Sequence, residues 1–238
     1  MDWSLFLPGP QGWGDELLAG LWLTIRLGLT AVALGTALGL ASALAELSRF
    51  TVLARLVAAY NLVMRSVPEL LVIFLLYYGL SFLIMGALAP FGIDGFVEVS
   101  PFWAGTLALS LIHAAYASEV FRGAFQVIPK GQIEAAQAFG MGRFLTFRRI
   151  KWPVAFRLSI AGLANLLMAT LKNTPLVSAI GLQDLVRVAG EAGQNTKLYF
   201  QFFMISLSIY LVIAALMMIL QTKAESRLFA HLRRGPAT

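Results

Sequence analysis

The feature that most constrains this chain is its long, uncharged apolar runs. From Leu27 to Ala45 there is no charged residue over 19 positions. As a helix, such a run spans about 28 Å, close to the thickness of the hydrocarbon core of a bilayer. Of the 238 residues, 59% are hydrophobic and 13% charged, against about 45–50% and about 25% in soluble domains. Lipid is therefore the expected solvent for most of the chain.

This pattern predicts an all-α integral membrane protein with about five transmembrane helices. One transmembrane domain is expected over residues 17–220, between a periplasmic or interfacial segment, 1–16, and a basic tail, 221–238. Pro68 removes a backbone donor and is expected to bend or break the second span. Gly35 and Gly39 form a GxxxG pair, which indicates close packing of the first span against another helix. The spans are expected at about 17–45, 56–84, 102–121, 154–171 and 200–220.

Lys and Arg residues are distributed unevenly between the predicted loops. Thirteen of the 18 belong to the intervals 46–56 and 122–157 and to the tail, whereas three belong to the opposite side. Because cytoplasmic loops are enriched in Lys and Arg, we expect the segment 129–153 and the C-terminus in the cytoplasm and the N-terminus outside. The same distribution accounts for the net charge of +6, so no nucleic acid is expected as a partner.

No enzymatic site can be assembled from these residues. The chain has no cysteine and two histidines, His113 and His231, which belong to different regions of the sequence. The sequence motifs of zinc proteases, serine hydrolases and nucleotide-binding loops are absent. We therefore expect a non-enzymatic chain that binds no cofactor and no metal by itself.

The polar, basic segment 129–153 separates two strongly apolar regions. Within it, residues Gln132 to Phe139 are predicted to form a short helix, which begins after Pro129 and ends at Gly140. A helix of this length spans about 12 Å and is too short to be stable alone, so it needs a partner. Three of its positions are small and allow a close fit to that partner: Ala135, Ala136 and Ala138.

Charged residues inside the spans are costly in lipid and need partners. Arg65 and Glu69 are four residues apart, and Glu119 and Arg122 are three apart, so each pair is expected to meet on one helix face. These residues either neutralise each other or face a water-filled path for a cationic solute. His113 and Asn165, two further polar side chains in the spans, also have two interpretations: they hold helices together or they contact a solute. The candidate substrate-path residues are Glu119, Glu69, His113, Asn165 and Arg65.

A motif in the basic segment resembles the EAA signature of the membrane subunits of bacterial ABC importers. Its residues are Glu134, Ala135, Ala136, Gly140, Ile150 and Pro153. Residues 65–68, 116–131 and 172–176 resemble the polar amino-acid branch of that family, and the resemblance covers nearly the whole chain. Within the branch, the histidine/lysine/arginine/ornithine and opine permeases are most similar in the acidic loop around Asp94. Trp152 departs from the wider signature, in which leucine is usual.

The resemblance implies a type I ABC importer permease core in the bacterial inner membrane, with a short cytoplasmic coupling helix. In this family the helix docks on a separate ATP-binding subunit, which acts as a dimer and holds ATP and Mg. Other implied partners are a periplasmic substrate-binding protein and a second, homologous permease, for which a heterodimer is favoured over a homodimer. The residues implied in ATPase coupling are Gln132, Glu134, Ala135, Ala136, Ala138, Phe139, Gly140 and Arg143.

The resulting hypothesis is a permease subunit of an ATP-driven importer for polar, cationic amino acids or opines. It forms half of a translocation path that works by alternating access. The alternative is a stand-alone channel or secondary transporter for a cationic solute, which needs no ATPase and gives the short helix no role. A membrane enzyme or assembly factor is a third possibility, and the lack of a catalytic set of residues counts against it.

Overall fold

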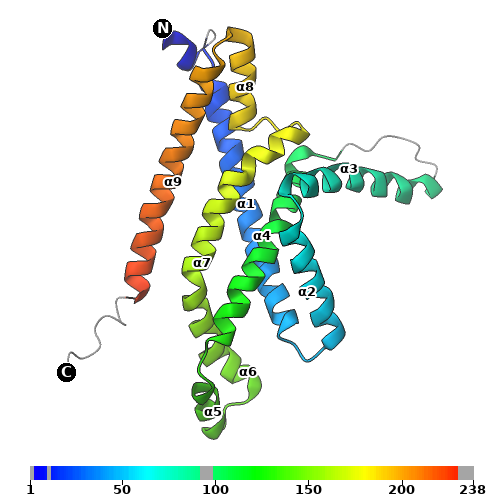
Figure 1. The fold of residues 1–238 in the computed structure, drawn as a ribbon, viewed down its shortest axis with the longest axis vertical. Helices are drawn as coiled ribbons and strands as arrows, with labels where there is room; N and C mark the ends of the chain where they lie inside the picture. Colours follow the sequence, from blue (N-terminus) through cyan, green and yellow to red (C-terminus); the bar gives the residue numbers. More distant parts are fainter. Residues whose placement is uncertain (1–2, 10–11, 92–98, 230–238) are drawn as a thin grey trace.

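The computed structural model describes residues 3–9, 12–91 and 99–229 (Figure 1), which contain helices and no strand. The acidic loop around Asp94 and the tail beyond Phe229 lie outside the described residues. The predicted all-α fold is confirmed. The helices of the described chain are η1 (Trp3–Phe6), α1 (Gly14–Glu46), α2 (Thr51–Ser66), α3 (Glu69–Leu88), η2 (Ala89–Phe91), α4 (Pro101–Gln126), α5 (Lys130–Ala138), α6 (Arg143–Thr146), the π-helix η3 (Phe147–Lys151), α7 (Trp152–Asn173), η4 (Thr174–Ile180), α8 (Leu185–Thr196) and α9 (Tyr199–Phe229).

The contact between α1 and α4 forms the centre of the structure. A Cβ atom added to Gly35 would lie 2.7 Å from the carbonyl oxygen of Ser110, and one added to Gly39 would lie 2.6 Å from the Cβ of Ala117. The two helices therefore touch through their backbones and run in the same direction. The close packing predicted from the GxxxG pair is confirmed, and α4 is its partner.

Four segments of the described chain are long and apolar enough to cross a membrane: Gly14–Glu46, Glu69–Ala87, Arg143–Ile180 and Tyr199–Lys223. They match four of the five predicted spans. The remaining predicted span, 102–121, corresponds to α4, which is packed against α1, α2, α3 and α7. Because protein rather than lipid surrounds it, α4 carries buried polar residues such as Ser110 and His113 and does not need an apolar surface on every side.

The second predicted span is two helices in the structure. The backbone at Val67 is extended (φ −89°, ψ 139°), so α2 ends at Ser66 and α3 begins at Glu69. Pro68 causes this break because it lacks a backbone N–H and disfavours the helical conformation in the residue before it. Beyond the break, α3 points away from the other helices (Figure 1).

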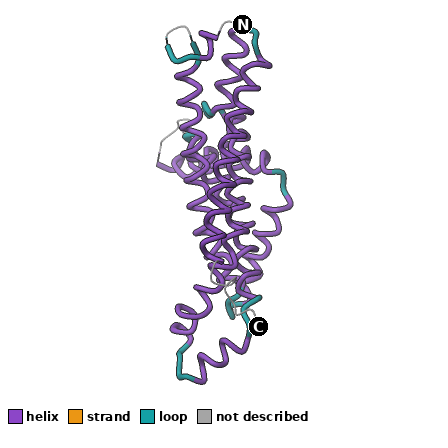
Figure 2. Tube along the Cα trace, turned by 90° about the vertical axis from the view of Figure 1, so that its left-hand side faces the viewer, coloured by secondary structure: helices purple, strands orange, loops and turns teal. Residues whose placement is uncertain are grey.

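The connection between α7 and α9 is also helical. After η4, the chain turns into α8, which packs against α9 and α1 at the end of the structure opposite α5 (Figures 1 and 2). Leu17 from α1, Leu185 from α8 and Phe202 from α9 share one buried cluster. Further along, α9 leaves the bundle, and 6% of its most apolar window is buried. Most of its surface is therefore available to lipid or to a partner.

Asp184 fixes the start of α8. Its Oδ1 accepts a hydrogen bond of 3.0 Å from the backbone N–H of Arg187, as an N-cap residue does. The side chain is fully buried, and its Oδ2 has no hydrogen-bond partner among the described residues. Burial raises the pKa of this carboxyl to about 6, although the backbone hydrogen bonds act in the opposite direction. The carboxylate is therefore held in the folded protein at a cost.

This cost predicts a pH dependence of stability. The folded chain binds the Asp184 proton more tightly than the unfolded chain, whose pKa is near 3.8. The contribution of this group to stability therefore falls as the pH rises from about 4 to about 6 and is constant above. Asp184→Asn keeps an N-cap acceptor and cannot titrate. We measure thermal unfolding of the purified proteins at pH 4.5 and 7.5. Between these two values the unfolding midpoint should fall less in this variant than in the wild type. An equal fall of the unfolding midpoint in both proteins contradicts the prediction. Glu191→Gln, also on α8, is the control.

Candidate functional site

The short helix of the basic segment is α5, at the end of the structure farthest from α8 (Figure 1). Pro129 precedes it, and Gly140 ends it with a positive φ of 77°. The N–H of Gly140 donates to the carbonyl oxygen of Gln137, and the N–H of Met141 donates to that of Ala136. These bonds satisfy carbonyls that the helix end leaves free. The helix predicted from residues 132–139 is thus present, and it begins at Lys130.

One face of α5 packs on its own chain. Ile133 contacts a cluster formed by Ala124 and Ile128 of the preceding region and Ala155 of α7. Ala136 is 4% exposed. The structure therefore turns Ala136 inward, which differs from the expectation that all three alanines offer a small surface to a partner. The helix is held between the end of α4 and the start of α7.

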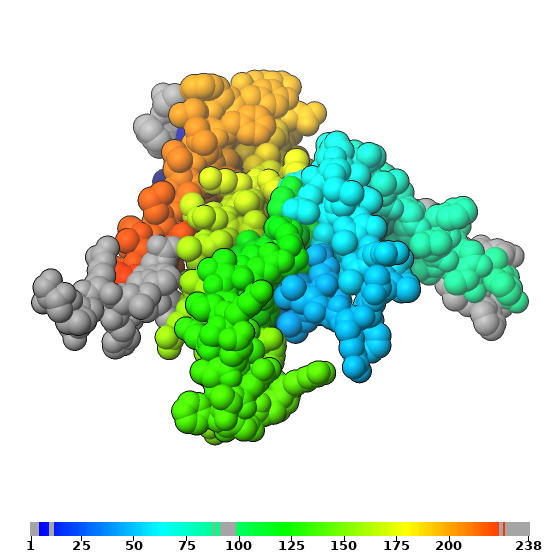
Figure 3. Space-filling model, turned by 60° about the horizontal axis from the view of Figure 1, so that its bottom comes forward, coloured from blue at the N-terminus to red at the C-terminus, as the bar shows by residue number. Residues whose placement is uncertain are grey.

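The opposite face of α5 is open. Phe139 is 87% exposed, and Phe144 of α6 is 75% exposed. Among the described residues, no ion pair includes a residue of α5. Figure 3 shows the α5–α6 region projecting from the rest of the molecule. Large apolar side chains exposed beside charged ones mark a surface for a protein partner. The exposed coupling candidates are Gln132, Glu134, Ala135, Ala138, Phe139, Gly140 and Arg143.

A second polar site joins α1, α2 and α4. Arg122 bonds Glu119 on the same helix, and its Nε lies 3.6 Å from Oε2 of Glu46 at the end of α1. Arg65 of α2 reaches Glu119 with 3.6 Å between Nη1 and Oε2. Asn61 of α2 donates to Glu46 and to the hydroxyl of Ser118, the latter at 3.1 Å. We call Glu46, Asn61, Arg65, Ser118, Glu119 and Arg122 the polar cluster.

The polar cluster confirms one predicted ion pair and corrects the other. Glu119 and Arg122 meet on α4 as predicted. Arg65 pairs with Glu119 on a different helix, whereas Glu69, on the far side of the Pro68 break, lies beside Asn173. Two arginines and two carboxylates leave the cluster with no net charge. In this structure Glu119 is therefore already neutralised from within the chain.

The other two candidate path residues bond between helices. His113 is 2% exposed and lies between Thr36 of α1 and Thr170 of α7, with ring nitrogen to hydroxyl distances of 3.0 and 2.8 Å. Asn165 of α7 accepts a hydrogen bond of 3.3 Å from Gln221 of α9. Both side chains hold helices together in this structure.

Sequence reasoning missed Glu46, Asn61 and Ser118. Glu46 was assigned to a loop because it follows an uncharged span, although a carboxylate at a span end opposite a run of arginines is a usable signal. Asn61 is 3% exposed, and a polar amide within an otherwise apolar run is also informative. Ser118 has no distinguishing signal, because Ser is common between membrane helices.

These features define an all-helical integral membrane protein, with a polar cluster between its helices and a short exposed helix at one end. Comparison with known proteins gives its family. Residues 35–230 match the family model described as binding-protein-dependent transport system inner membrane component, and the chain belongs to this family. It is thus a permease subunit of an ABC importer, a transport component rather than an enzyme, and ATP hydrolysis takes place on a separate subunit.

Curated relatives cover nearly the whole chain. An octopine transport system permease protein of Rhizobium meliloti is 39% identical over 227 residues, which are 95% of this chain and 96% of the relative. A histidine/lysine/arginine/ornithine transport system permease protein of Salmonella typhimurium is 39% identical over 201 residues, 84% of this chain and 88% of the relative.

Solved structures agree with the fold. An amino acid ABC transporter crystallised with histidines has a chain that is 30% identical, with a TM-score of 0.78 over 90% of this chain and 95% of that one. A methionine ABC transporter in an inward-facing conformation has a TM-score of 0.72 over 90% of this chain and 97% of that one. It is 18% identical and therefore supports the fold alone.

Proposed function

We propose that this chain is the permease for polar, cationic amino acids or opines, and that α5 couples it to the ATPase. The observation that carries the coupling role is the open face of α5, with Phe139 87% exposed at the end of a helix anchored between two spans. The substrate class is supported by the relatives, whose names specify octopine and histidine/lysine/arginine/ornithine transport. The carboxylate of Glu69, which no ion pair of the described residues includes, agrees with a cationic solute.

The mechanism follows from how α5 is attached. Three residues, 127–129, join α4 to α5, and η3 leads from α6 into α7. When the ATP-binding subunits close, a helix docked in their groove moves with them. The displacement passes to α4, which carries His113 and three residues of the polar cluster, and to α7, whose Thr170 bonds His113. The spans then tilt as rigid bodies, and the path opens to the other side of the membrane.

The proposed orientation places α5 and the C-terminus in the cytoplasm and the N-terminus outside. Charge supports it, since 13 of the 18 Lys and Arg residues lie on the α5 side of the predicted topology. The exposed apolar surfaces of α3 and α9 leave room for a second permease, and we propose that this partner is a homologous, non-identical chain. The substrate-binding protein then delivers the solute at the α8 end.

The test is purification of the complex through a tag on this chain, followed by reconstitution into lipid vesicles. We expect an ATP-binding subunit and a second permease to copurify, and we expect ATP-dependent uptake of L-arginine or octopine with the cognate binding protein. Uptake that persists without ATP, or a binding protein that prefers neutral or acidic amino acids, contradicts the respective part of the proposal.

Gly140 provides a prediction specific to coupling. Its φ of 77° is unfavourable for residues with a Cβ, but no atom lies within 4 Å of an added Cβ, so backbone conformation alone decides the outcome. Gly140→Val costs about 1–2 kcal/mol, enough to disturb the end of a marginal helix, and should reduce ATP-driven uptake about tenfold. Asn adopts this conformation more readily, so Gly140→Asn should retain most uptake. Equal uptake by both variants, measured at equal membrane levels, contradicts the prediction.

A further inference from the structure

A pocket of about 300 Å³ lies between the end of α1, the end of α4, α5 and η3. We call it the α1–α5 pocket. Leu44 and Leu47 at the end of α1 and Phe125 of α4 supply much of its apolar wall. Phe147 of η3 lines it too, and its ring stacks on that of Phe125 with 6.0 Å between the ring centroids. The wall is therefore built by four separate helices, and two of its aromatic rings support each other.

The α1–α5 pocket lies where the hydrocarbon part of the chain ends. The uncharged run Leu27–Ala45 of α1 ends beside Leu44, and Glu46 is the first charged residue after it. On α4, the last helical residue is Gln126, which contributes an exposed amide to the pocket. A run of about 28 Å ends at the boundary between the hydrocarbon core and the headgroups. The pocket is therefore at the depth where acyl chains join their phosphate groups.

The cations beside the α1–α5 pocket have no counter-ion in the chain. Lys151, the last residue of η3, lines the pocket and is partly buried. Arg148 and Arg149 of the same π-helix are exposed, and none of the three belongs to an ion pair of the described residues. Among the described residues, no carboxylate lines the pocket, and Glu46 between its two leucines is paired with Arg122. This surplus of positive charge favours an anionic ligand.

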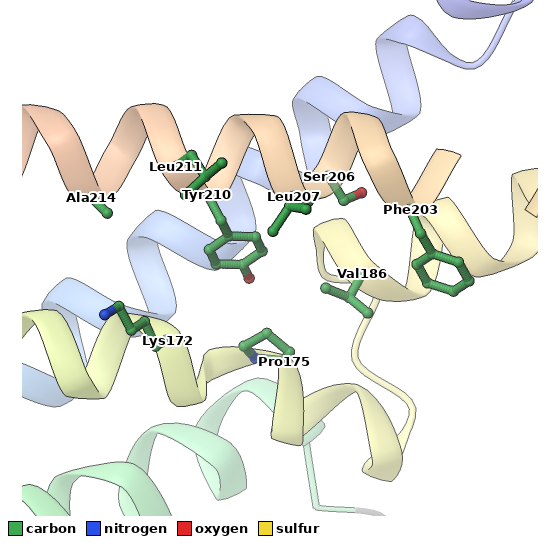
Figure 4. A pocket seen from close by; sticks show the side chains of 9 residues that line it. All are labelled: Lys172, Pro175, Val186, Phe203, Ser206, Leu207, Tyr210, Leu211 and Ala214. Atoms are coloured by element: carbon green, nitrogen blue, oxygen red, sulfur yellow. The ribbon is translucent and has the colours of Figure 1, made fainter. Parts of the chain in front are cut away.

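A larger pocket elsewhere in the structure lacks this combination. It has a volume of about 460 Å³ and lies between α7, η4, α8 and α9. Figure 4 shows that Lys172 at its rim extends away from the cavity, whereas apolar side chains such as Pro175 and Val186 border it. The α1–α5 pocket differs because three unpaired cations belong to the π-helix that lines it, and π-helical turns are frequent at functional sites.

We propose that the α1–α5 pocket binds an anionic phospholipid of the surrounding bilayer. The lipid phosphate pairs with the Lys151 ammonium group and accepts a hydrogen bond from the Gln126 amide, and an acyl chain lies against Phe125. Arg148 and Arg149 disfavour a headgroup that carries its own cation, so a lipid with net negative charge is selected. Basic pockets between membrane helices bind such headgroups in other proteins. The site concerns the chain and its bilayer and does not depend on which solute is carried.

A lipid in this pocket also contacts α5 from its inner face. Ile133 of α5 lines the pocket, whereas Phe139 lies on the open face and is 87% exposed. The bound lipid is therefore placed between the bilayer and α5 and leaves the open face free. Because a ligand that binds only the folded state raises its stability, the lipid should raise the thermal unfolding midpoint.

The experiment measures lipid binding to the purified, delipidated complex by native mass spectrometry. Phosphatidylglycerol and phosphatidylcholine are compared, because both have a phosphate and two acyl chains but only the first has a net negative charge. We expect the wild-type complex to bind phosphatidylglycerol about tenfold more tightly. Lys151→Gln should weaken phosphatidylglycerol binding about fivefold, the order that one basic residue contributes, and Lys151→Arg should retain it. Lys223→Gln, an exposed lysine of α9 outside the pocket, is the control and should behave as wild type.

Leu47→Trp tests whether the lipid lies in the pocket, because it adds bulk to the wall and leaves every charge in place. It should weaken the binding of both lipids. If Lys151→Gln binds phosphatidylglycerol as tightly as wild type, or if wild type does not distinguish the two lipids, the proposal is overturned. If Leu47→Trp keeps wild-type binding while Lys151→Gln loses it, the cations hold the lipid outside the pocket and the proposal is again overturned.

Inorganic phosphate is titrated in parallel, because it has the charge of the headgroup without the acyl chains. We expect phosphatidylglycerol to raise the unfolding midpoint of the wild-type complex and phosphate to leave it unchanged. If phosphate raises the midpoint of wild type but not of Lys151→Gln, and displaces phosphatidylglycerol, the pocket is a site for a soluble anion and the lipid proposal is overturned.

Discussion

Gly39→Leu is expected to prevent the permease from accumulating as a folded protein. A single added Cβ already lies 2.6 Å from the Cβ of Ala117 and 2.8 Å from the carbonyl oxygen of Ala114. A backbone carbonyl in the middle of a helix cannot move aside, so α1 must separate from α4. The separation also stretches the contacts of Glu46 with Arg122 and of Thr36 with His113. Overpacking at one site costs about 1–3 kcal/mol, and the larger side chain adds the loss of these polar contacts.

Gly39→Ala and Gly79→Ala form the matched test of this argument. Both replacements gain helix propensity, about 1 kcal/mol relative to glycine. Gly79 of α3 has no atom within 4 Å of an added Cβ, so its replacement should leave stability unchanged or raised. Gly39→Ala should lower the thermal unfolding midpoint, and Gly39→Leu should eliminate the monodisperse peak in detergent chromatography. A monodisperse Gly39→Leu protein with the wild-type midpoint contradicts the packing described for α1 and α4.

The sequence was most informative where a local rule operates alone. Pro129 and Gly140 bracket α5, and their effects on the backbone do not depend on distant contacts. The break at Pro68 is of the same kind. The GxxxG pair predicted a close helix contact, but it could not identify α4 as the partner, because the spacing describes one helix and contains nothing about its neighbour.

Arg65 shows where local rules conflict. The four-residue spacing predicts a pair with Glu69 only if one helix continues through both positions. Pro68 ends that helix between them, so Glu69 belongs to α3 and Arg65 is free to reach Glu119 on α4 at 3.6 Å. The break and the Arg65–Glu69 pair were therefore incompatible expectations, and steric exclusion by proline prevailed over the small gain from an ion pair.

Ala136 shows a second kind of limit. Composition indicated a slim helix, but it did not say which side of the helix faces the partner. In the structure, Ile133 and Ala136 pack against the chain itself. Glu134, Ala138 and Phe139 therefore face outward. The contacts of His113 with Thr36 and Thr170 likewise depend on the register between helices, which no pattern within one helix specifies.

Phe139→Ala is expected to separate the permease from its ATP-binding subunit without affecting the fold. Phe139 is 87% exposed, so its own chain gains little from the ring. An aromatic side chain in a partner's pocket typically contributes about 2 kcal/mol or more to association, which corresponds to a loss of about thirtyfold in affinity when it is truncated. We expect the amount of copurified ATPase to fall about thirtyfold. The stimulation of ATP hydrolysis by loaded binding protein should fall with it.

Val52→Ala is the matched control for Phe139→Ala, because Val52 is 74% exposed and lies at the start of α2, outside the α5–α6 region. It should retain the ATPase, and all variants should keep the wild-type unfolding midpoint. Glu134→Arg removes no apolar surface, so it tests the role of charge at the same face. We expect this variant to abolish uptake. If Phe139→Ala and Glu134→Arg both transport normally, the docking surface lies elsewhere. If they keep the ATPase but lose uptake, α5 transmits its motion through these side chains and another surface supplies the affinity.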